Sequence, residues 1–243
     1  MKIKKLKLKN YRNCEDLELL FEDNKNLIIG KNAQGKTNIL ESIFFLSSLK
    51  TQRTSNNLEL IKFQKNIVEI NAEITKNTEI ELDFSYTSDK KREVKINKVK
   101  TRPKEFKQIL KTVLFSTEDL LLLRGSPENR RSWLDTAILQ IYPAYDDRLS
   151  KYNKIRTQKN NYLKNYDENS TLLDVYDEQL AILGSNIIFL RKKFLKEIEA
   201  ITQQKHLTIS GSEELSISYS CNFLEEETEI EQILEKYKQK QQE

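Results

Sequence analysis

The chain has 243 residues, of which 37% are hydrophobic and 32% are charged, and its formal net charge is +4. That length fits one large domain or one domain with two lobes, and the weak positive charge permits nucleic acid as a partner without requiring it. The sequence has no signal-peptide pattern, no apolar run long enough to cross a membrane and no cysteine or histidine spacing of a metal site, so we exclude secreted, membrane-spanning and zinc-binding classes and expect a cytoplasmic protein.

The amino-terminal elements predict a strand, a loop and a helix in direct succession. Alternating apolar residues predict strands over residues 1–9 and around residues 17–21. Leu27-Ile28-Ile29 is a short apolar run typical of a buried central strand, and it ends at Gly30. Residues 37–49 then have the apolar spacing of a helix.

The middle of the chain predicts more strands. Period-two patterns over residues 68–99 indicate an antiparallel meander, and residues 113–115 are another short apolar strand. A helix is predicted to begin at Pro127, with Ser126 as its N-cap.

The carboxy-terminal half is predicted to be mainly helical. Residues 145–200 indicate two long helices in an antiparallel pair, with a break at 165–170. Residues 207–220 predict two short strands, and residues 225–243 predict an exposed or frayed helix. We therefore predict a P-loop ATPase lobe over residues 1–140, a helical lobe over 141–206, and a return toward the first lobe with a charged tail over 207–243.

The segment Gly30-Lys31-Asn32-Ala33-Gln34-Gly35-Lys36-Thr37 matches the phosphate-loop pattern G-x-x-x-x-G-K-[ST] in full. The glycines let successive N–H groups point at phosphate oxygens, and the helix that follows adds the partial positive charge of its N-terminus. Lys36 is expected to reach the β- and γ-phosphates as the catalytic residue, and the Thr37 hydroxyl is expected to ligate Mg²⁺. All eight residues are predicted to bind ATP.

The acidic residue that hydrolysis requires is not found by the same reasoning. Such a residue should follow a second apolar strand, where it holds Mg²⁺ and orients the attacking water. Leu172-Leu173-Asp174 and Trp133-Leu134-Asp135 are the nearest candidates, but both lie in stretches with helical spacing. The sequence therefore predicts nucleotide binding, leaves enzymatic activity uncertain, and leads us to expect negligible turnover by this chain alone.

Several segments match, in order, the motifs of one family of bacterial ATPases. They are Leu8-Lys9-Asn10-Tyr11-Arg12-Asn13, the loop from Gly30 to Asn38, Arg53–Ile61, Phe115–Leu120, Gly125–Asp135 and Tyr176–Ala181. From residue 1 to about 220 the chain resembles RecF, a family whose ATPase heads are like those of SMC and Rad50 proteins. Thr117 stands where that family usually has proline.

The resemblance implies an α/β fold: a P-loop NTPase head of the ABC/SMC type. This head would have a mixed β-sheet around the P-loop helix, an antiparallel meander and a helical second lobe. It also implies that Arg12 and Asn13 lie beside the nucleotide phosphates. Family members continue beyond 243 residues, and that part carries the signature motif and the Walker B carboxylate. We therefore expect this chain to be an N-terminal portion.

The resemblance further implies a function in recombinational repair, replication-fork maintenance and the SOS response. Two heads would sandwich ATP in an ATP-dependent homodimer that holds single-stranded, duplex or gapped DNA. RecO and RecR would be its partners, and the assembly would help RecA load.

Basic residues give two further candidate contacts with DNA or with a partner lobe. Residues 89–107 hold nine Lys or Arg against three acids, and we single out Lys95, Lys98 and Arg102; a solvated hairpin face is the alternative. Arg130 and Arg131 lie in the first turns of their helix, where a cation opposes the helix dipole unless an anion is near. We expect them to contact nucleotide, DNA or a partner lobe, and a surface salt bridge is the alternative.

Other features of the sequence receive ordinary structural interpretations. We expect Trp133 to be a core residue and residues 145–164 to form a solvated helix.

Alternative functions are an SMC- or Rad50-like head with a different partner and a non-catalytic nucleotide-sensing module. A small-molecule kinase would need an arginine-rich lid, which we cannot place.

Overall fold

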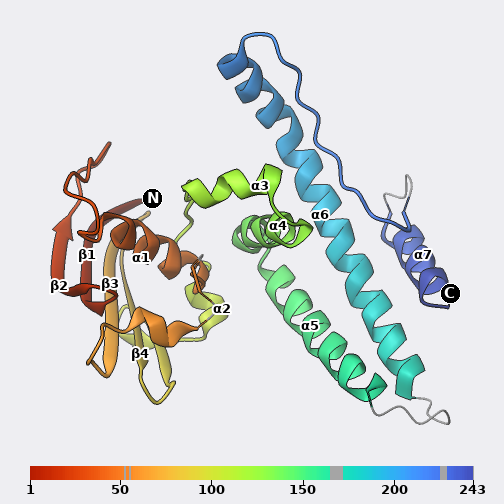
Figure 1. Ribbon diagram of the computed structural model, residues 1–243, viewed down its shortest axis with the longest axis horizontal. Coiled ribbons are helices and arrows are strands. Elements are labelled where there is room, and N and C mark those ends of the chain that lie inside the picture. Colours follow the sequence, from red (N-terminus) through yellow and green to blue (C-terminus); the bar gives the residue numbers. More distant parts are fainter. Residues whose placement is uncertain (52, 55, 165–171, 225–228, 243) are drawn as a thin grey trace. The chain divides into compact units, whose positions relative to one another are not determined.

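The computed structural model describes every residue of the chain except 52, 55, 165–171, 225–228 and 243 (Figure 1). The chain divides into two compact units, residues 1–124 and 125–243. This division does not test the predicted lobes at 1–140, 141–206 and 207–243, which stay a prediction.

The first unit is an antiparallel sheet covered on one face by a helix. Its strands are β1 (Lys2–Tyr11), β2 (Cys14–Leu20), β3 (Ile67–Thr75), β4 (Glu79–Thr87), β5 (Arg92–Ile96) and β6 (Val99–Lys100). Its helices are α1 (Lys36–Ser48), α2 (Pro103–Phe106) and α3 (Leu121–Arg124), with 3-10 turns η1 (Asn57–Leu60) and η2 (Thr117–Leu120). The strand order is β2-β1-β3-β4-β5-β6, and every neighbouring pair is antiparallel.

The alternation of apolar residues sets the register of this sheet. Leu6 pairs with Ala72 and Leu8 with Ile70, and all four side chains are buried on the same face. The register shifts between Ile3 and Lys5, where the apolar pattern of the first strand is out of step. The predicted strands over 1–9, 17–21 and the meander 68–99 are confirmed.

Helix α1 covers the apolar face of the sheet (Figure 1). The ring of Phe45 meets the ring of Phe84 edge-on, with centroids 4.7 Å apart. Because the core forms between α1 and the central strands, the loop that precedes α1 is held at one end of a rigid layer.

Two predicted strands of this unit are wrong. Residues 27–29 and 113–115 have no regular secondary structure. Their side chains are exposed in alternation, with Leu27 and Ile29 each 83% exposed, Val113 99% and Phe115 80%. A strand needs a neighbouring backbone for its hydrogen bonds, and no described segment pairs with either run. The described sheet is consequently antiparallel throughout, where a mixed sheet was expected.

The second unit consists of helices α4 (Pro127–Ile141), α5 (Pro143–Leu163), α6 (Leu172–Ser210) and α7 (Ile230–Gln242). Helices α5 and α7 both pack along α6 (Figure 1). The core joins α4, α5 and α6 through Leu134, Ile138, Tyr145, Ile187, Leu190 and Phe194. The predicted helix from Pro127 and the long helix pair are confirmed, whereas the predicted break at 165–170 lies outside the described residues.

Three other predictions for this unit are corrected. Residues 207–220 do not form two strands, because α6 continues to Ser210 and residues 213–220 have no regular structure. The tail helix α7 is packed against α6, where a Cβ atom on Gly184 would lie 2.4 Å from the ring of Tyr237. Trp133 is 42% exposed and is not a core residue; its neighbour Leu134 enters the core instead.

Candidate nucleotide-binding site

The phosphate loop depends on two residues with left-handed backbone conformations. Gly35 has φ of 92° and Ala33 has φ of 64°. A Cβ atom on Gly35 would also lie 3.0 Å from Oδ1 of Asn13, so both the backbone and the neighbouring side chain require glycine. The loop therefore turns sharply into α1, which begins at Lys36.

The N–H groups of the loop are available to an anion. Along the chain from residue 31, the first backbone N–H that donates to a described residue is that of Ile39. Its acceptor is the Gly35 carbonyl, at 3.1 Å. The N–H groups of residues 31–38 donate none within the described residues. They lie at the N-terminus of a 13-residue helix, where the dipole favours negative charge. This arrangement suits a phosphate group.

The Lys36 side chain folds back over the loop. Its ammonium group donates to the carbonyl oxygens of Gly30 at 2.6 Å and Lys31 at 2.7 Å. The positive charge is thus held inside the turn of the loop, where phosphate oxygens could exchange with the two carbonyls. Thr37 is exposed at the start of α1, as a ligand for a metal on the phosphates would have to be.

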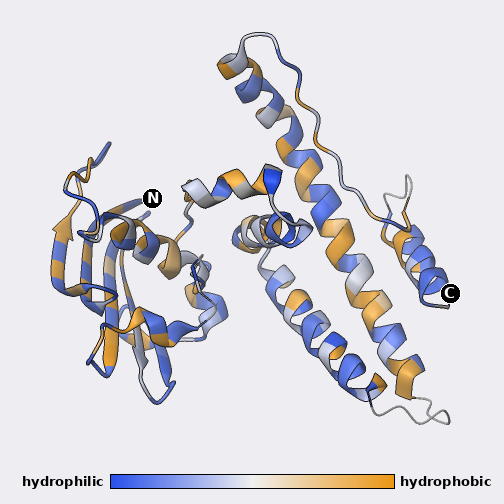
Figure 2. Cartoon of the chain, in the orientation of Figure 1, coloured by the Kyte–Doolittle hydropathy of each residue, from blue (hydrophilic) through white to orange (hydrophobic). Residues whose placement is uncertain are grey.

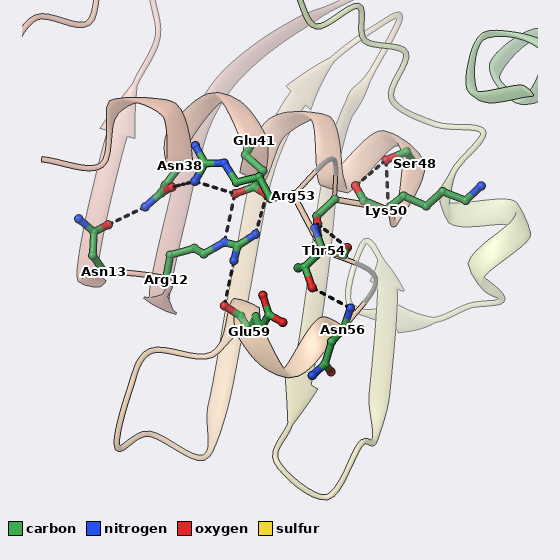
Figure 3. A network of polar contacts seen from close by, with 11 residues as sticks. Arg12, Asn13, Asn38, Glu41, Ser48, Lys50, Arg53, Thr54, Asn56 and Glu59 are labelled. Carbon is green, nitrogen blue, oxygen red and sulfur yellow. Dashed lines mark hydrogen bonds and ion pairs between the residues drawn. The ribbon is translucent and has the colours of Figure 1, made fainter. Parts of the chain in front are cut away.

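A chain of side-chain contacts links this loop to the segment after α1 (Figure 3). Asn13 donates to the Ala33 carbonyl at 3.2 Å, and its Oδ1 accepts a hydrogen bond from Asn38 at 2.7 Å. Arg53 in turn donates to Oδ1 of Asn38 at 3.0 Å. The β1–β2 turn, the loop, α1 and the segment around Arg53 are therefore fixed to one another.

A buried ion pair lies beside this chain of contacts. The Arg12 guanidinium makes two hydrogen bonds to Glu41, at 2.7 and 3.2 Å, and a third to the Glu59 carbonyl at 3.2 Å (Figure 3). Burial lowers the pKa of Arg12, but the hydrogen bond and negative charge of Glu41 outweigh it, so that the pKa is raised. Arg12 stays charged, and its fork is occupied by protein partners.

The two predicted nucleotide-binding residues outside the loop, Arg12 and Asn13, have different partners in the structure. It brings Asn13 into contact with the loop but directs Arg12 at Glu41. Direct contact of Arg12 with a nucleotide therefore stays a prediction.

Sequence reasoning did not single out Asn38, Glu41 and Arg53 as site residues. The only signal for Glu41 is a charged residue within the apolar spacing of α1, one turn after Thr37. The contacts of Arg53 arise from folding of residues far apart in the chain.

The predicted DNA or interface contacts are dispersed. Lys95 pairs with Glu93 at 2.9 Å, and Lys98 lies 4.0 Å from Glu81. Arg102 is the exposed N-cap of α2. In the other unit, Arg130 donates to the Gly125 carbonyl at 3.1 Å and Arg131 is exposed. These contacts with DNA or a partner stay predictions.

No group of three or more His, Cys, Asp or Glu side chains among the described residues is arranged to hold a metal ion. None of the described helices is both long enough and apolar enough to cross a membrane.

Comparisons with known proteins show which family the chain belongs to. Residues 1–243 match the AAA ATPase domain family. The chain is 39% identical over 241 residues to the DNA replication and repair protein RecF of Clostridioides difficile, covering 98% of this chain and 65% of the relative. It is 43% identical over 225 residues to RecF of Streptococcus gordonii, covering 90% and 62%.

A solved structure of the recombination mediator protein RecF with ATP, from the RecFOR pathway, is similar in fold. It superposes with a TM-score of 0.92 at 32% identity, covering 99% of this chain and 66% of that one. This similarity confirms the predicted α/β fold of a P-loop ATPase. The chain spans slightly less than two thirds of the length of these relatives.

Proposed function

The chain belongs to the AAA ATPase domain family and is similar to RecF over nearly all of its length, and from this premise we propose that it is the ATP-binding portion of a RecF-type DNA repair ATPase. The observation that carries the proposal is the set of free backbone N–H groups over residues 31–38, which lie at the start of α1 beside the Lys36 ammonium. Backbone donors and a lysine in this arrangement select a polyphosphate.

Each loop residue has a part in holding ATP. The N–H groups of residues 31–38 would cradle the phosphates, and Lys36 would move from the Gly30 and Lys31 carbonyls to the β- and γ-phosphate oxygens. The Thr37 hydroxyl would ligate Mg²⁺, which offsets the negative charge of the phosphates. Asn13 would hold the loop through its bond to Ala33.

The wider repair function also belongs to this proposal. A chain of the length of its relatives would supply strands beside residues 27–29 and 113–115, together with the carboxylate for hydrolysis. Two such heads would dimerise around ATP and bind single-stranded, duplex or gapped DNA in the cytoplasm. They would act with RecO and RecR to help RecA load. The exposed apolar alternation of both segments supports this view.

The proposal is tested by ATP titration of the 243-residue chain and of Lys36→Ala, with a fluorescent ATP analogue and Mg²⁺. We expect Lys36→Ala to weaken binding by about 10- to 100-fold, because a charge-assisted contact to phosphate is worth about 1.5 to 3 kcal/mol. The matched control is Lys31→Ala, which removes an exposed lysine from the same loop and keeps its backbone N–H. Wild-type affinity in Lys36→Ala would reject the site.

A further inference from the structure

We propose that the solvent-facing side of α5 binds the phosphate backbone of DNA, an inference that rests on the proposed repair function. Residues 148–163 of this helix contain five Lys or Arg and no Asp or Glu, and the two acids of α5, Asp146 and Asp147, lie near its start. A helix surface of one charge sign attracts a polyanion over about a Debye length. The sequence predicts a solvated helix here, and for the hairpin around Lys95 it leaves DNA contact and a solvated face open. The ion pairs of the structure favour α5 over the hairpin.

Ion pairing distinguishes the cations of α5 from several lysines of the sheet. On the sheet, Lys5 and Lys7 pair with Glu18, and Lys100 pairs with Glu93, so these cations are partly neutralised. On α5, Lys151, Lys154 and Arg156 are exposed and make no ion pair with any described residue. Their charge is therefore available to an external anion.

The inward side of α5 explains why Lys151 and Lys154 face out. Tyr145 is fully buried, and Leu149 and Tyr152 pack against the same core, while Lys159 pairs with Asp177 on α6. Tyr145, Leu149 and Tyr152 follow one another at about one helical turn, and Lys159 lies two turns after Tyr152. Lys151 and Lys154 lie away from this stripe, whereas Arg156 is exposed but in phase with it. The remaining positions of α5 form a polar outer side, and Figure 2 shows predominantly hydrophilic colouring along the helix.

The outer side also carries neutral hydrogen-bond donors between and beyond the cations. Ser150, Thr157, Gln158, Asn160 and Asn161 are all exposed. Hydroxyl and amide groups of this kind contact phosphate oxygens in protein–DNA interfaces. Lys151 and Lys154 are one turn apart on the same side of the helix, with about 4.5 Å between them along its axis, which is close to the spacing of neighbouring phosphates along one strand. The surface therefore matches a backbone and offers no aromatic platform for base stacking.

The same surface does not suit a membrane. A helix that lies in a bilayer interface carries large apolar side chains opposite or beside its cations. Two large apolar residues of this region are exposed: Ile141, just before α5, and Leu163, its last residue. Between them, no described residue is both large and apolar and also exposed. A nucleic-acid backbone fits the chemistry better than an anionic lipid surface.

The experiment measures how DNA binding by the 243-residue chain depends on salt. Affinities for a duplex and for a single strand are determined by fluorescence anisotropy between 50 and 200 mM NaCl, for the wild type and for Lys151→Gln/Lys154→Gln. Each lost phosphate contact lowers the slope of log K against log salt by about 0.9 for duplex and about 0.7 for single strands. We expect a slope reduction of about 1 to 2 and roughly tenfold or more weaker binding at 100 mM.

Two matched variants isolate the surface. Lys2→Gln/Lys4→Gln removes the same formal charge from exposed lysines that pair with Asp23, and should leave the slope unchanged. Lys95→Gln/Lys98→Gln removes the hairpin cations. The inference is overturned if only the hairpin variant reduces the slope, or if all three double variants reduce it equally. It is also overturned if the wild type binds phosphatidylserine vesicles more tightly than DNA.

ATP binding is measured on the same samples with the fluorescent analogue. Loss of ATP binding together with an intact α5 effect on DNA would reject the nucleotide proposal and keep the DNA surface. Intact ATP binding with no α5 effect would reject only the surface.

Discussion

At the scale of single residues, the site depends on a carboxylate that does not touch the phosphate loop. The Glu41 side chain is 5% exposed and that of Arg12 is 14% exposed, so water screens neither charge well. A pair of this kind stabilises a fold only while both partners are present, because removal of one leaves an uncompensated buried charge. Glu41 also lies 4.0 Å from Arg53, and it therefore balances two cations at the edge of the site.

We predict that Glu41→Ala lowers the free energy of unfolding by about 3 kcal/mol, because it leaves the buried Arg12 guanidinium without its carboxylate partner. Urea denaturation followed by circular dichroism measures this change. The control is Glu15→Ala, which breaks exposed pairs with Lys62 and Lys65 and should leave the midpoint nearly unchanged. Equal midpoints for wild type and Glu41→Ala would show that Arg12 has another means of compensation.

Single residues also show how much of the site can be predicted from the sequence. The glycines, Lys36 and Thr37 are adjacent in the chain, and the chemistry of phosphate binding fixes their spacing, so the loop can be predicted from a short motif. Asn38 and Arg53 meet because α1 and the following segment fold against each other. No local pattern encodes that meeting.

At the scale of elements, a buried polar cluster fastens the helices of the second unit. Arg191 on α6 makes two hydrogen bonds to Asp135 on α4, at 2.7 and 3.0 Å, through one guanidinium nitrogen. It also donates to the hydroxyl of Tyr145 on α5 at 3.0 Å. Burial raises the pKa of Tyr145, which keeps the hydroxyl neutral. Three helices are thus joined at one guanidinium.

We predict that Asp135→Leu alone costs the chain about 3 kcal/mol of stability, because Arg191 is left buried without its carboxylate. The double variant Asp135→Leu/Arg191→Met should recover most of that loss, since an apolar pair of similar volume can replace a buried ion pair. Thermal or urea unfolding of the two single variants and the double variant measures the coupling. Additive losses would mean that the two residues act independently.

Elements whose pattern is local were predicted well, and elements that need a distant partner were not. The meander and the helix beginning at Pro127 follow from apolar spacing and from a proline at the first helical position. Gly211 lies within residues 207–220, for which the sequence predicts two short strands. Instead it has φ of 82° and donates to the Leu207 carbonyl at 2.8 Å, which ends α6. A turn between strands and the end of a helix can both use glycine, so the sequence could not separate them.

At the scale of the whole molecule, the chain exposes apolar segments that would be strands if they had neighbours. Val113 and Phe115 lie in one run without regular secondary structure, Leu27 and Ile29 lie in another, and all four side chains are at least 80% exposed. Unpaired backbone next to exposed apolar side chains is a template for association between chains.

We predict that the 243-residue chain associates as its concentration rises and that Phe115→Lys reduces this association. Sedimentation velocity over a range of concentrations measures the effect. Phe63→Lys is the matched control, because Phe63 is 85% exposed but lies outside residues 27–29 and 113–115. If both variants behave alike, general hydrophobicity and not the unpaired runs drives the association.

The central claim is that the backbone N–H groups of residues 31–38 receive the phosphates of ATP. The most direct measurement is a titration of the isotope-labelled chain with ATP and Mg²⁺, followed through backbone amide signals in two-dimensional NMR. The claim predicts saturable shifts of the amides of Lys31 to Thr37, largest in the loop and absent in Lys36→Ala. Saturable ATP binding that leaves those amides in place and moves others would contradict it.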